Sequence, residues 1–190
     1  YDVIINCAAH TAVDKAESEA NLANQINHFA VQQLANIAKQ HSIKLIHIST
    51  DYVFNGKQHR PYIETDEVEP QGIYGKTKLS GEQAIQKIQK TNAIIIRTGW
   101  VYSEYGNNFV KTMLKLGSER GSLNVIFDQV GTPTYAGDLA EAIMAVVQSD
   151  NFSQTDFKTQ IHHFSNEGAC SWYDFTKTIF ELTNTQCQVS

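Results

Sequence analysis

The sequence has few cysteines and no long apolar run. Its 190 residues include three cysteines, Cys7, Cys170 and Cys187, and none of them belongs to a Cys-x-x-Cys pair. An odd number of widely spaced cysteines argues against a disulfide framework and favours a reducing compartment, so we expect a cytoplasmic protein. The longest apolar runs, such as Ile94 to Ile96, are far shorter than the ~20 residues that span a bilayer, so we expect no membrane partner.

Basic residues are also scarce. Lysine and arginine number 15 against 20 acidic residues, which gives a net charge of -5, and no Lys/Arg cluster is longer than two residues. We therefore expect no nucleic-acid partner, because proteins that bind nucleic acids carry basic patches that neutralise phosphates. Hydrophobic residues make up 42% of the chain, which is enough to form a sizeable core.

The start of the sequence lacks an initiator methionine and a basic, signal-like segment. It opens directly on the apolar run Val3 to Ile5. A buried strand this early usually has neighbours from preceding sequence, so we expect the chain to be a piece of a longer protein.

Strand patterns alternate with helical patterns along the rest of the chain. The strands are expected at 2–8, 43–49, 93–98, 123–127 and 160–164. The helices are expected at 19–40, 74–90, 108–119, 137–148 and, after the capping residue Ser171, as far as 182. This alternation predicts an α/β fold with a doubly wound parallel sheet. The strands near 3–6, 44–49, 94–98 and 160–164 should be parallel neighbours, and the polar segment 55–71 should be a surface loop.

Unusual side chains follow three of these strands. The first strand is followed by small residues, Cys7 to Thr11, the second by 49–52 (Ser-Thr-Asp-Tyr), and the third by 98–102 (Thr-Gly-Trp-Val-Tyr). Ligands of doubly wound sheets bind beyond the carboxyl ends of the strands. Hydroxyls, a carboxylate and aromatic rings at one sheet edge therefore predict a pocket for a polar, ring-shaped ligand.

The helix that begins near Tyr74 adds a candidate acid. Tyr74 and Lys78 are four residues apart and so share one helix face. An ammonium group beside a phenol should lower the pKa of Tyr74 from about 10, which would suit a general acid for a developing alkoxide, with Thr50 sharing the hydrogen bond. Tyr173 and Lys177 have the same spacing, but no strand-end Ser or Thr lies at a comparable distance upstream, so we expect them to pack. From the residues alone, a catalytic role and a packing role for Tyr74 both stay open.

The motifs resemble the extended short-chain dehydrogenase/reductase family, and within it the reductases of dTDP-linked 4-keto sugars. The segments that carry this resemblance are DVIINCAAHTAVDKAE (2–17), HISTDYVFNG (47–56), YGKTKLSGE (74–82), RTGWVYSEYGNNFVKTM (97–113) and DQVGTPTYAGDLA (128–140). The resemblance implies a Rossmann-like fold that lacks its first βα units, together with part of a smaller domain. Residues 1–98 and 135–165 would form the second half of the NAD(P)-binding domain. Residues 99–134 and 166–190 would belong to the nucleotide-sugar-binding domain.

The resemblance also implies roles for individual residues. Thr50, Tyr74 and Lys78 match the Ser/Thr-Tyr-Lys triad, in which Tyr74 would protonate the C4 carbonyl oxygen while NADPH or NADH delivers hydride. Lys78 would hold the nicotinamide ribose. Cofactor contacts are implied for Ala8, Ala9, His10, Thr11, Tyr74 and Lys78. Contacts with the dTDP-sugar substrate are implied for Thr50, Asp51 and Trp100.

The chain departs from the family pattern at two places. The glycine-rich dinucleotide turn is absent, because the family places it on a strand that would precede this chain. Some members bind Mg²⁺ through a Glu soon after the D-Q-x-G-x-P-T run, but Gly137 matches that position here, so we expect no metal site.

Other activities in the same family remain alternatives. Dehydratases place two acids after the triad Thr, whereas here Asp51 is followed by Tyr52, which argues against that chemistry. An epimerase uses the same triad, and non-catalytic relatives exist, such as the regulatory subunit of methionine adenosyltransferase. His10 could be a hydrogen-bonded turn residue, and Trp100 could be core packing. The sequence leaves the choice of NADH or NADPH open, with a homodimer as a candidate assembly.

Overall fold

The computed structural model describes all 190 residues, which form two compact units. The first unit comprises residues 1–98 and 145–164, and the second comprises 99–144 and 165–190. The chain leaves the first unit after Thr98 and returns to it at Ala145, whereas we expected the return at residue 135. The binding functions expected of the two parts stay predictions.

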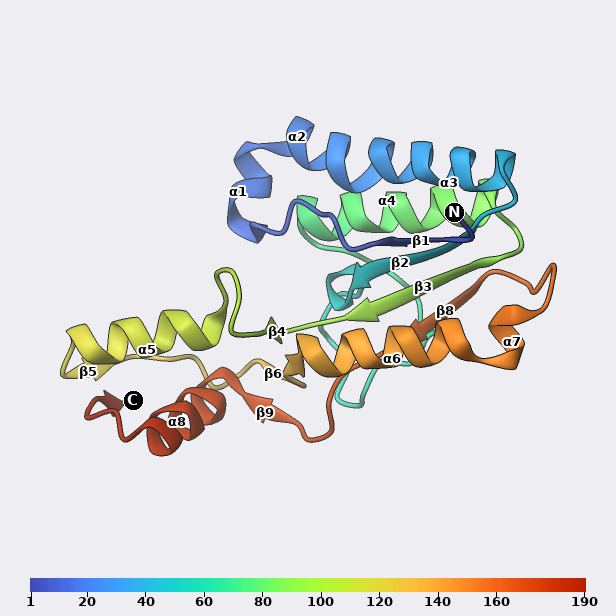
Figure 1. Ribbon diagram of the computed structural model, residues 1–190. Helices are drawn as coiled ribbons and strands as arrows, with labels where there is room; N and C mark the ends of the chain where they lie inside the picture. Colours follow the sequence, from blue (N-terminus) through green and yellow to red (C-terminus); the bar gives the residue numbers. More distant parts are fainter. The chain divides into compact units, whose positions relative to one another are not determined.

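A four-stranded sheet forms the centre of the first unit (Figure 1). Its strands, in spatial order, are β1 (Val3–Asn6), β2 (Lys44–Thr50), β3 (Ala93–Thr98) and β8 (Gln160–His163). All three neighbouring pairs are parallel, which confirms the predicted fold class and the predicted set of neighbours. Ser49 pairs with Arg97 and Thr50 with Thr98, so the polar ends of β2 and β3 lie level with each other.

The helices of the first unit connect these strands. They are α1 (Val13–Ser18), α2 (Ala20–Asn24), the π-helical turn η1 (Gln25–Phe29), α3 (Ala30–Gln40), the 3₁₀ turn η2 (Asp51–Val53), α4 (Ile73–Ile88) and α7 (Asp150–Ser153). Helices α3 and α4 lie side by side over one face of the sheet (Figure 1). The core between these helices and the sheet consists of Val31, Ala35, Ala38, Leu45, Ile85, Ala93 and Ile95.

The helix predicted at 19–40 is interrupted by the π-helical turn. Asn27 in this turn is fully buried, and Gly81 of α4 packs against its backbone. A Cβ atom at Gly81 would lie 2.3 Å from the Asn27 carbonyl oxygen, so only glycine allows this approach. Such single-turn widenings often mark functional positions.

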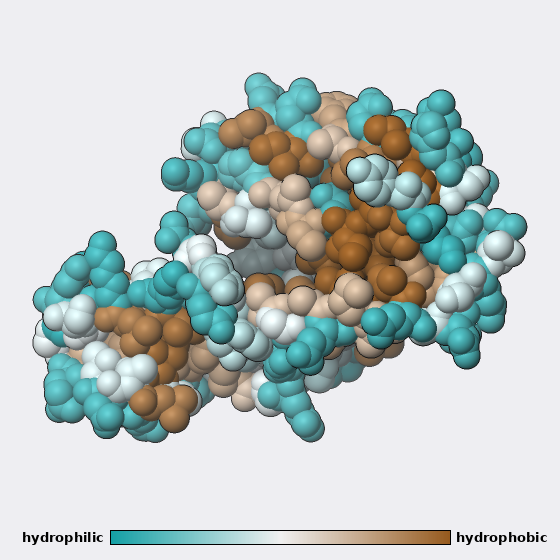
Figure 2. Space-filling view, in the orientation of Figure 1, coloured by the Kyte–Doolittle hydropathy of each residue, from teal (hydrophilic) through white to brown (hydrophobic).

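The first strand is shorter and more exposed than its apolar pattern predicted. Strand β1 pairs only with β2, and Ile5 is 41% exposed. Figure 2 shows hydrophobic surface over this part of the first unit. Within the residues of this chain, β1 has a neighbour on one side only, which accounts for the exposure of Ile5.

The second unit contains short strand pairs and two packed helices. The pairs are β4 (Val101–Tyr102) with β7 (Thr134–Tyr135), β6 (Val130–Gly131) with β9 (Cys170–Ser171), and β5 (Ser122–Leu123) with β10 (Gln188–Val189). Helix α5 (Phe109–Glu119) packs against α8 (Trp172–Thr183) around Met113, Leu123, Ile179, Phe180 and Val189. Helix α6 (Ala136–Gln148) begins in this unit. No helix of the chain has the length and apolar character that a membrane crossing needs.

The strand predicted at 123–127 is also wrong in extent. Pairing with β10 covers only Ser122 and Leu123, and the following residues form no strand. Phe127 is 76% exposed, so its apolar side chain is not buried against a sheet.

A candidate active site at the strand ends of the first unit

Thr50 closes strand β2 and organises the turn that follows. Its Oγ1 accepts a hydrogen bond from the Tyr52 backbone N–H at 3.2 Å and donates one to Asp51 Oδ1 at 3.1 Å. The side chain is buried, and it caps the 3₁₀ turn η2. Burial raises the pKa of Asp51 above its ordinary value, and the hydrogen bond from Thr50 works against that rise. The predicted site residues Thr50 and Asp51 are therefore part of one hydrogen-bonded turn.

Tyr74 approaches this turn from the first turn of helix α4. Its ring meets that of Tyr52 edge to face, with centroids 5.5 Å apart, and the Thr50 side chain is near enough to its hydroxyl to lower the pKa of Tyr74, against the larger effect of burial. Gly75 makes the approach possible, because a Cβ atom there would lie 2.2 Å from the Tyr52 carbonyl oxygen. The structure thus brings Thr50 and Tyr74 together, as the sequence predicted.

Lys78 lies one helical turn further along α4, and only 2% of its surface is exposed. Its Nζ donates a 2.6 Å hydrogen bond to the Ile48 carbonyl oxygen and lies 3.5 Å from Nε2 of the buried His47. Burial lowers the pKa of Lys78 to about 8, while the charge of Glu82 acts in the opposite direction. The ammonium group is therefore held at the ends of the central strands.

The expected electrostatic effect of Lys78 on Tyr74 is wrong. The pKa of Tyr74 is raised, chiefly because the phenol is buried, and the negative charge of Asp51 raises it further. The Lys78 ammonium points to the Ile48 carbonyl group, and burial controls the ionisation of the phenol. Tyr74 therefore keeps its proton over a wider pH range than an exposed tyrosine does.

The turn after β1 is fixed by Asn27. Oδ1 of Asn27 accepts from the His10 backbone N–H at 2.8 Å, and its Nδ2 donates to the His10 carbonyl oxygen at 3.1 Å and to Thr77 Oγ1 at 3.2 Å. The side chain of His10 is 3.0 Å from Glu19, as a hydrogen-bonded turn residue would be. The segment from Ala8 to Thr11 is thereby tied to α4, three residues after Tyr74. The sequence did not predict a role for Asn27. Its only signal in the sequence is that it is a polar residue on an otherwise apolar helix face.

Two further carboxylates were also missed. Glu17 of α1 accepts a 2.7 Å hydrogen bond from the Ile73 backbone N–H at the beginning of α4. Glu82, one turn beyond Lys78, is completely buried and pairs with Arg97. A charged residue in step with Tyr74 and Lys78 along one helix face was the available signal for Glu82.

Trp100 belongs to the second unit, whereas the other predicted site residues belong to the first. Its ring stacks on that of Trp172, with centroids 3.4 Å apart, and a Cβ atom on Gly131 would lie 2.6 Å from it. The backbone of Trp100 is left-handed, with φ 52°, which is costly for a bulky side chain and often marks a functional position. A substrate contact for Trp100 stays a prediction.

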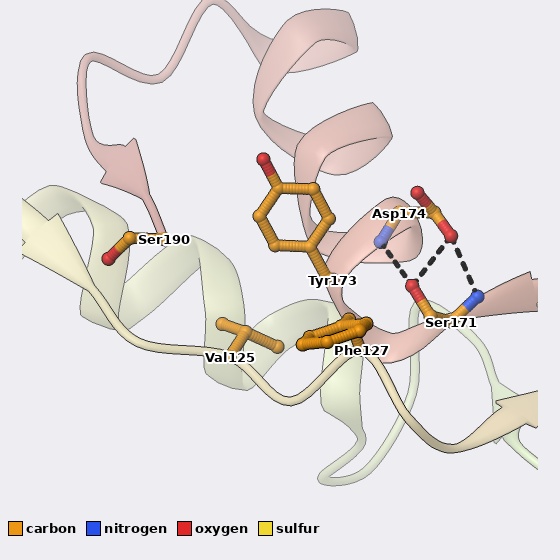
Figure 3. Close-up of a pocket in the computed structure, with 6 residues that line it drawn as sticks. All are labelled: Val125, Phe127, Ser171, Tyr173, Asp174 and Ser190. Atoms are coloured by element: carbon orange, nitrogen blue, oxygen red, sulfur yellow. Dashed lines mark hydrogen bonds between the residues drawn. The ribbon is translucent and has the colours of Figure 1, made fainter.

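Tyr173, the second tyrosine with a lysine four residues on, also lies in the second unit. Figure 3 shows its ring beside Val125 and Phe127 around an open pocket of about 300 Å³. Ser171 and Asp174 form a capping box at the start of the same helix (Figure 3). Lys177 is exposed, so this tyrosine and lysine do not form a buried pair like that on α4.

Comparisons with known proteins agree on one family. The model of the RmlD substrate binding domain matches residues 1–190. The dTDP-4-dehydrorhamnose reductase of Aggregatibacter actinomycetemcomitans is 45% identical over 180 residues, which cover 95% of this chain and 60% of that protein. The spore coat polysaccharide biosynthesis protein SpsK of Bacillus subtilis has the same identity and coverage. The chain thus spans about 60% of the length of these curated relatives.

Solved structures give the same result. The dTDP-4-dehydrorhamnose reductase of Clostridium acetobutylicum has a TM-score of 0.92 and 45% identity, over 100% of this chain and 64% of that one. The Bacillus anthracis enzyme, solved in complex with NADP, has a TM-score of 0.90 and 41% identity, over 100% and 65%. The resemblance drawn from the motifs is confirmed, and the chain belongs to the RmlD substrate-binding domain family.

Proposed function

We propose that this protein is an NADPH- or NADH-dependent oxidoreductase that reduces the C4 keto group of dTDP-4-dehydro-L-rhamnose to give dTDP-L-rhamnose. The observation that carries the proposal is the arrangement of Thr50, Tyr74 and Lys78 around the end of β2, with Tyr74 against the turn that Thr50 caps and Lys78 on the Ile48 carbonyl group. Relatives named dTDP-4-dehydrorhamnose reductase, at 44–45% identity, support the choice of substrate.

The residues at this sheet edge fit a nicotinamide cofactor. Ala8 and Ala9 follow β1 with small side chains, which leave the backbone open to close approach. Lys78 has three N–H donors and gives only one short hydrogen bond to a protein carbonyl group, so its ammonium can also bind ribose hydroxyls. Cys7, in the turn after β1, and Lys78 influence each other's pKa, which supports a cofactor site shared by this turn and the lysine.

In the proposed reaction, the bound nicotinamide cofactor supplies hydride to the C4 carbon. Tyr74 donates its phenolic proton to the C4 oxygen as negative charge develops there, and its raised pKa keeps that proton in place before the reaction. The Thr50 hydroxyl, which donates its single proton to Asp51 Oδ1 in this structure, turns that proton to the same oxygen when substrate binds and so supplies a second hydrogen bond. Lys78 holds the cofactor ribose with its ammonium group, and Asp51 and Trp100 contact the nucleotide sugar.

An epimerase and a non-catalytic binding protein are the competing proposals. The UDP-glucuronic acid 4-epimerase of Bacillus cereus has a TM-score of 0.84 at 21% identity, which supports a shared fold only. A reductase consumes the reduced cofactor in proportion to product, whereas an epimerase regenerates it, and a binding protein consumes none.

The decisive experiment is a turnover assay of the protein at its full encoded length. We expect loss of NADPH or NADH absorbance in proportion to added dTDP-4-dehydro-L-rhamnose, with dTDP-L-rhamnose as the product by mass spectrometry. Conversion of the sugar without net cofactor loss would support the epimerase, and no conversion with either cofactor would contradict both enzymes. The proposal also includes a cytoplasmic location, supported by three free cysteines, and a homodimer, which sedimentation would test.

A further inference from the structure

Ser49, Glu82 and Arg97 form a buried polar network next to the candidate active site. Glu82 is 0% exposed and Arg97 is 4% exposed. Arg97 Nη2 donates to Glu82 Oε2 at 2.7 Å and its Nε donates to Oε1 at 3.0 Å, which is a two-point pair. The Ser49 hydroxyl donates a further short hydrogen bond to Glu82 Oε1. Outside this pair, the guanidinium group lies 5.1 Å from the centre of the Phe54 ring.

The network joins the three elements that carry the site. Glu82 follows Lys78 by four residues on α4, and Lys78 follows Tyr74 by four, so the three side chains share one face of the helix. Ser49 precedes Thr50 on β2, and Arg97 is its register partner on β3. One carboxylate therefore ties the helix of Tyr74 and Lys78 to the strand that ends in Thr50.

Stability alone does not account for such a pair. Removing two charges from water is expensive, and well-packed apolar side chains of similar volume often stabilise a fold as well or better. Apolar replacements would, however, lack the directional bonds that fix how far α4 can slide along β2 and β3. The two-point geometry of an arginine and a carboxylate provides that directional constraint.

Glu82 also acts on Lys78 electrostatically. Three titratable groups from packed elements interact with the lysine: His47 of β2, Cys7 after β1, and Glu82 of its own helix. Burial lowers the pKa of His47 well below its ordinary value, so its ring is neutral near pH 7. Glu82 is therefore the negative charge that offsets the burial of the Lys78 ammonium.

We propose that Glu82 and Arg97 are a positioning pair, which fixes the place of Tyr74 and Lys78 beside Thr50. Neither residue touches the reacting atoms. The catalytic meaning of the pair rests on the proposed function, whereas its effect on Lys78 does not depend on turnover.

The test replaces the whole network by apolar side chains, in the variant Ser49→Ala/Glu82→Leu/Arg97→Met. The lysine side chains are labelled with ¹³C, and the signal of Lys78 is identified by its loss in Lys78→Met. We expect the titration midpoint of Lys78 to fall by about one pH unit, because the variant removes the negative charge of Glu82, which raises the pKa of Lys78. In the turnover assay at pH 7, kcat should fall about 10-fold with KM unchanged, and the alkaline limb should move to lower pH.

Two controls separate positioning from general damage. Arg60→Met/Asp66→Leu removes an exposed ion pair in the surface loop, and it should leave both the Lys78 midpoint and kcat unchanged. The signal of the exposed Lys177 should not differ between the network variant and the wild type. Glu82→Asp keeps the negative charge, so its Lys78 titration midpoint should lie close to the wild-type value.

Several outcomes would overturn the proposal. A folded network variant with an unchanged Lys78 midpoint and unchanged kcat would do so. If that variant does not fold, Glu82→Gln/Arg97→Gln, which keeps a neutral hydrogen-bonded pair, should show the same fall in midpoint. Failure of both variants to fold would make the pair a requirement for folding, and the proposal would be wrong. A protein without reductase activity whose Lys78 midpoint still falls would contradict the proposed function and leave the positioning pair in place.

Discussion

Helices α4 and α8 carry the same Tyr-x-x-x-Lys spacing in different surroundings. On α4, Lys78 is buried against the Ile48 carbonyl group and Tyr74 lies against Tyr52 in the turn that follows β2. On α8, Lys177 is exposed and Tyr173 stands beside an open pocket. Spacing of four residues places two side chains on one helix face, but only α4 directs that face at the ends of parallel strands.

Burial alters the ionisation of Tyr74 and Lys78 on α4. It raises the pKa of Tyr74 and lowers the pKa of Lys78 to about 8, so both shifts disfavour the charged form. At pH 7 the phenol keeps its proton, and the ammonium group is still mostly charged. Each helix therefore serves as the control for the other, since the spacing is the same and the burial differs.

The largest effect should come from removing the phenolic hydroxyl of Tyr74. In the full-length protein, Tyr74→Phe should lower kcat by about 10²- to 10⁴-fold, which is the usual contribution of a positioned general acid. KM should change little because the ring remains. Tyr173→Phe should leave kcat nearly unchanged. Steady-state kinetics with the dTDP-linked 4-keto sugar would measure both, and equal losses at the two tyrosines would show that the site has been assigned to the wrong helix.

The next effect concerns stability, and here we expect the substitution to increase the free energy of unfolding. Because the Lys78 pKa of about 8 lies below its ordinary value of 10.5, the unfolded chain holds this proton more tightly. The fold therefore carries the cost of a buried ammonium group below pH 8, and that cost disappears as pH rises from 8 to 10.5. We expect Lys78→Met to stabilise the fold at pH 7 by roughly 1–3 kcal/mol, after the loss of the bond to Ile48, while it removes activity.

Urea unfolding at pH 7 and pH 10 would measure this effect. The difference between Lys78→Met and the wild type should shrink at the higher pH, because the wild-type lysine is then neutral in the fold. Lys177→Met should change stability by less than about 0.5 kcal/mol at both values, as surface substitutions usually do. A Lys78→Met protein that is less stable than the wild type at pH 7 would contradict the assignment of a costly buried charge.

The parallel sheet was predictable because its strands are short apolar runs separated by helical patterns. The runs that end at Ile48 and Ile96 have neighbours on both sides, and their patterns match their burial. Ile5 has the same apolar character, but it is partly exposed because β1 pairs only with β2 within the residues of this chain. The π-helical turn at Asn27 was also unpredictable, because it depends on the close approach of Gly81 from another helix.

The candidate site was predictable where polar side chains directly follow the end of a strand. Thr50 and Tyr74 were expected to bind the same substrate oxygen, and the structure places Tyr74 against the turn that Thr50 caps. The direction of the Tyr74 pKa shift was not predictable, because it depends on burial and on where the Lys78 ammonium points. Glu82 and Arg97 lie 15 residues apart in the chain, and only the packing of α4 on β3 makes them a pair.

The smallest expected effects lie at the starts of the two helices. At α8, the Ser171 hydroxyl accepts from the Asp174 backbone N–H at 3.0 Å, so the cap is local. Ser171→Ala should cost about 1 kcal/mol of unfolding free energy, which is typical of a lost cap. It should leave kcat unchanged, because α8 carries no proposed catalytic group.

Helix α4 has no capping side chain of its own at Gly72, and Glu17 from α1 accepts from the Ile73 backbone N–H instead. Glu17→Gln keeps an oxygen acceptor but removes the negative charge beside the positive end of the helix dipole. We expect a loss of about 0.3–1 kcal/mol at low salt that fades at high salt, whereas the loss from Ser171→Ala should be insensitive to salt. Chemical unfolding at two ionic strengths distinguishes the two cases. A loss from Glu17→Gln that does not depend on salt would mean that the carboxylate acts at the start of α4 through its hydrogen bond alone, without help from its charge.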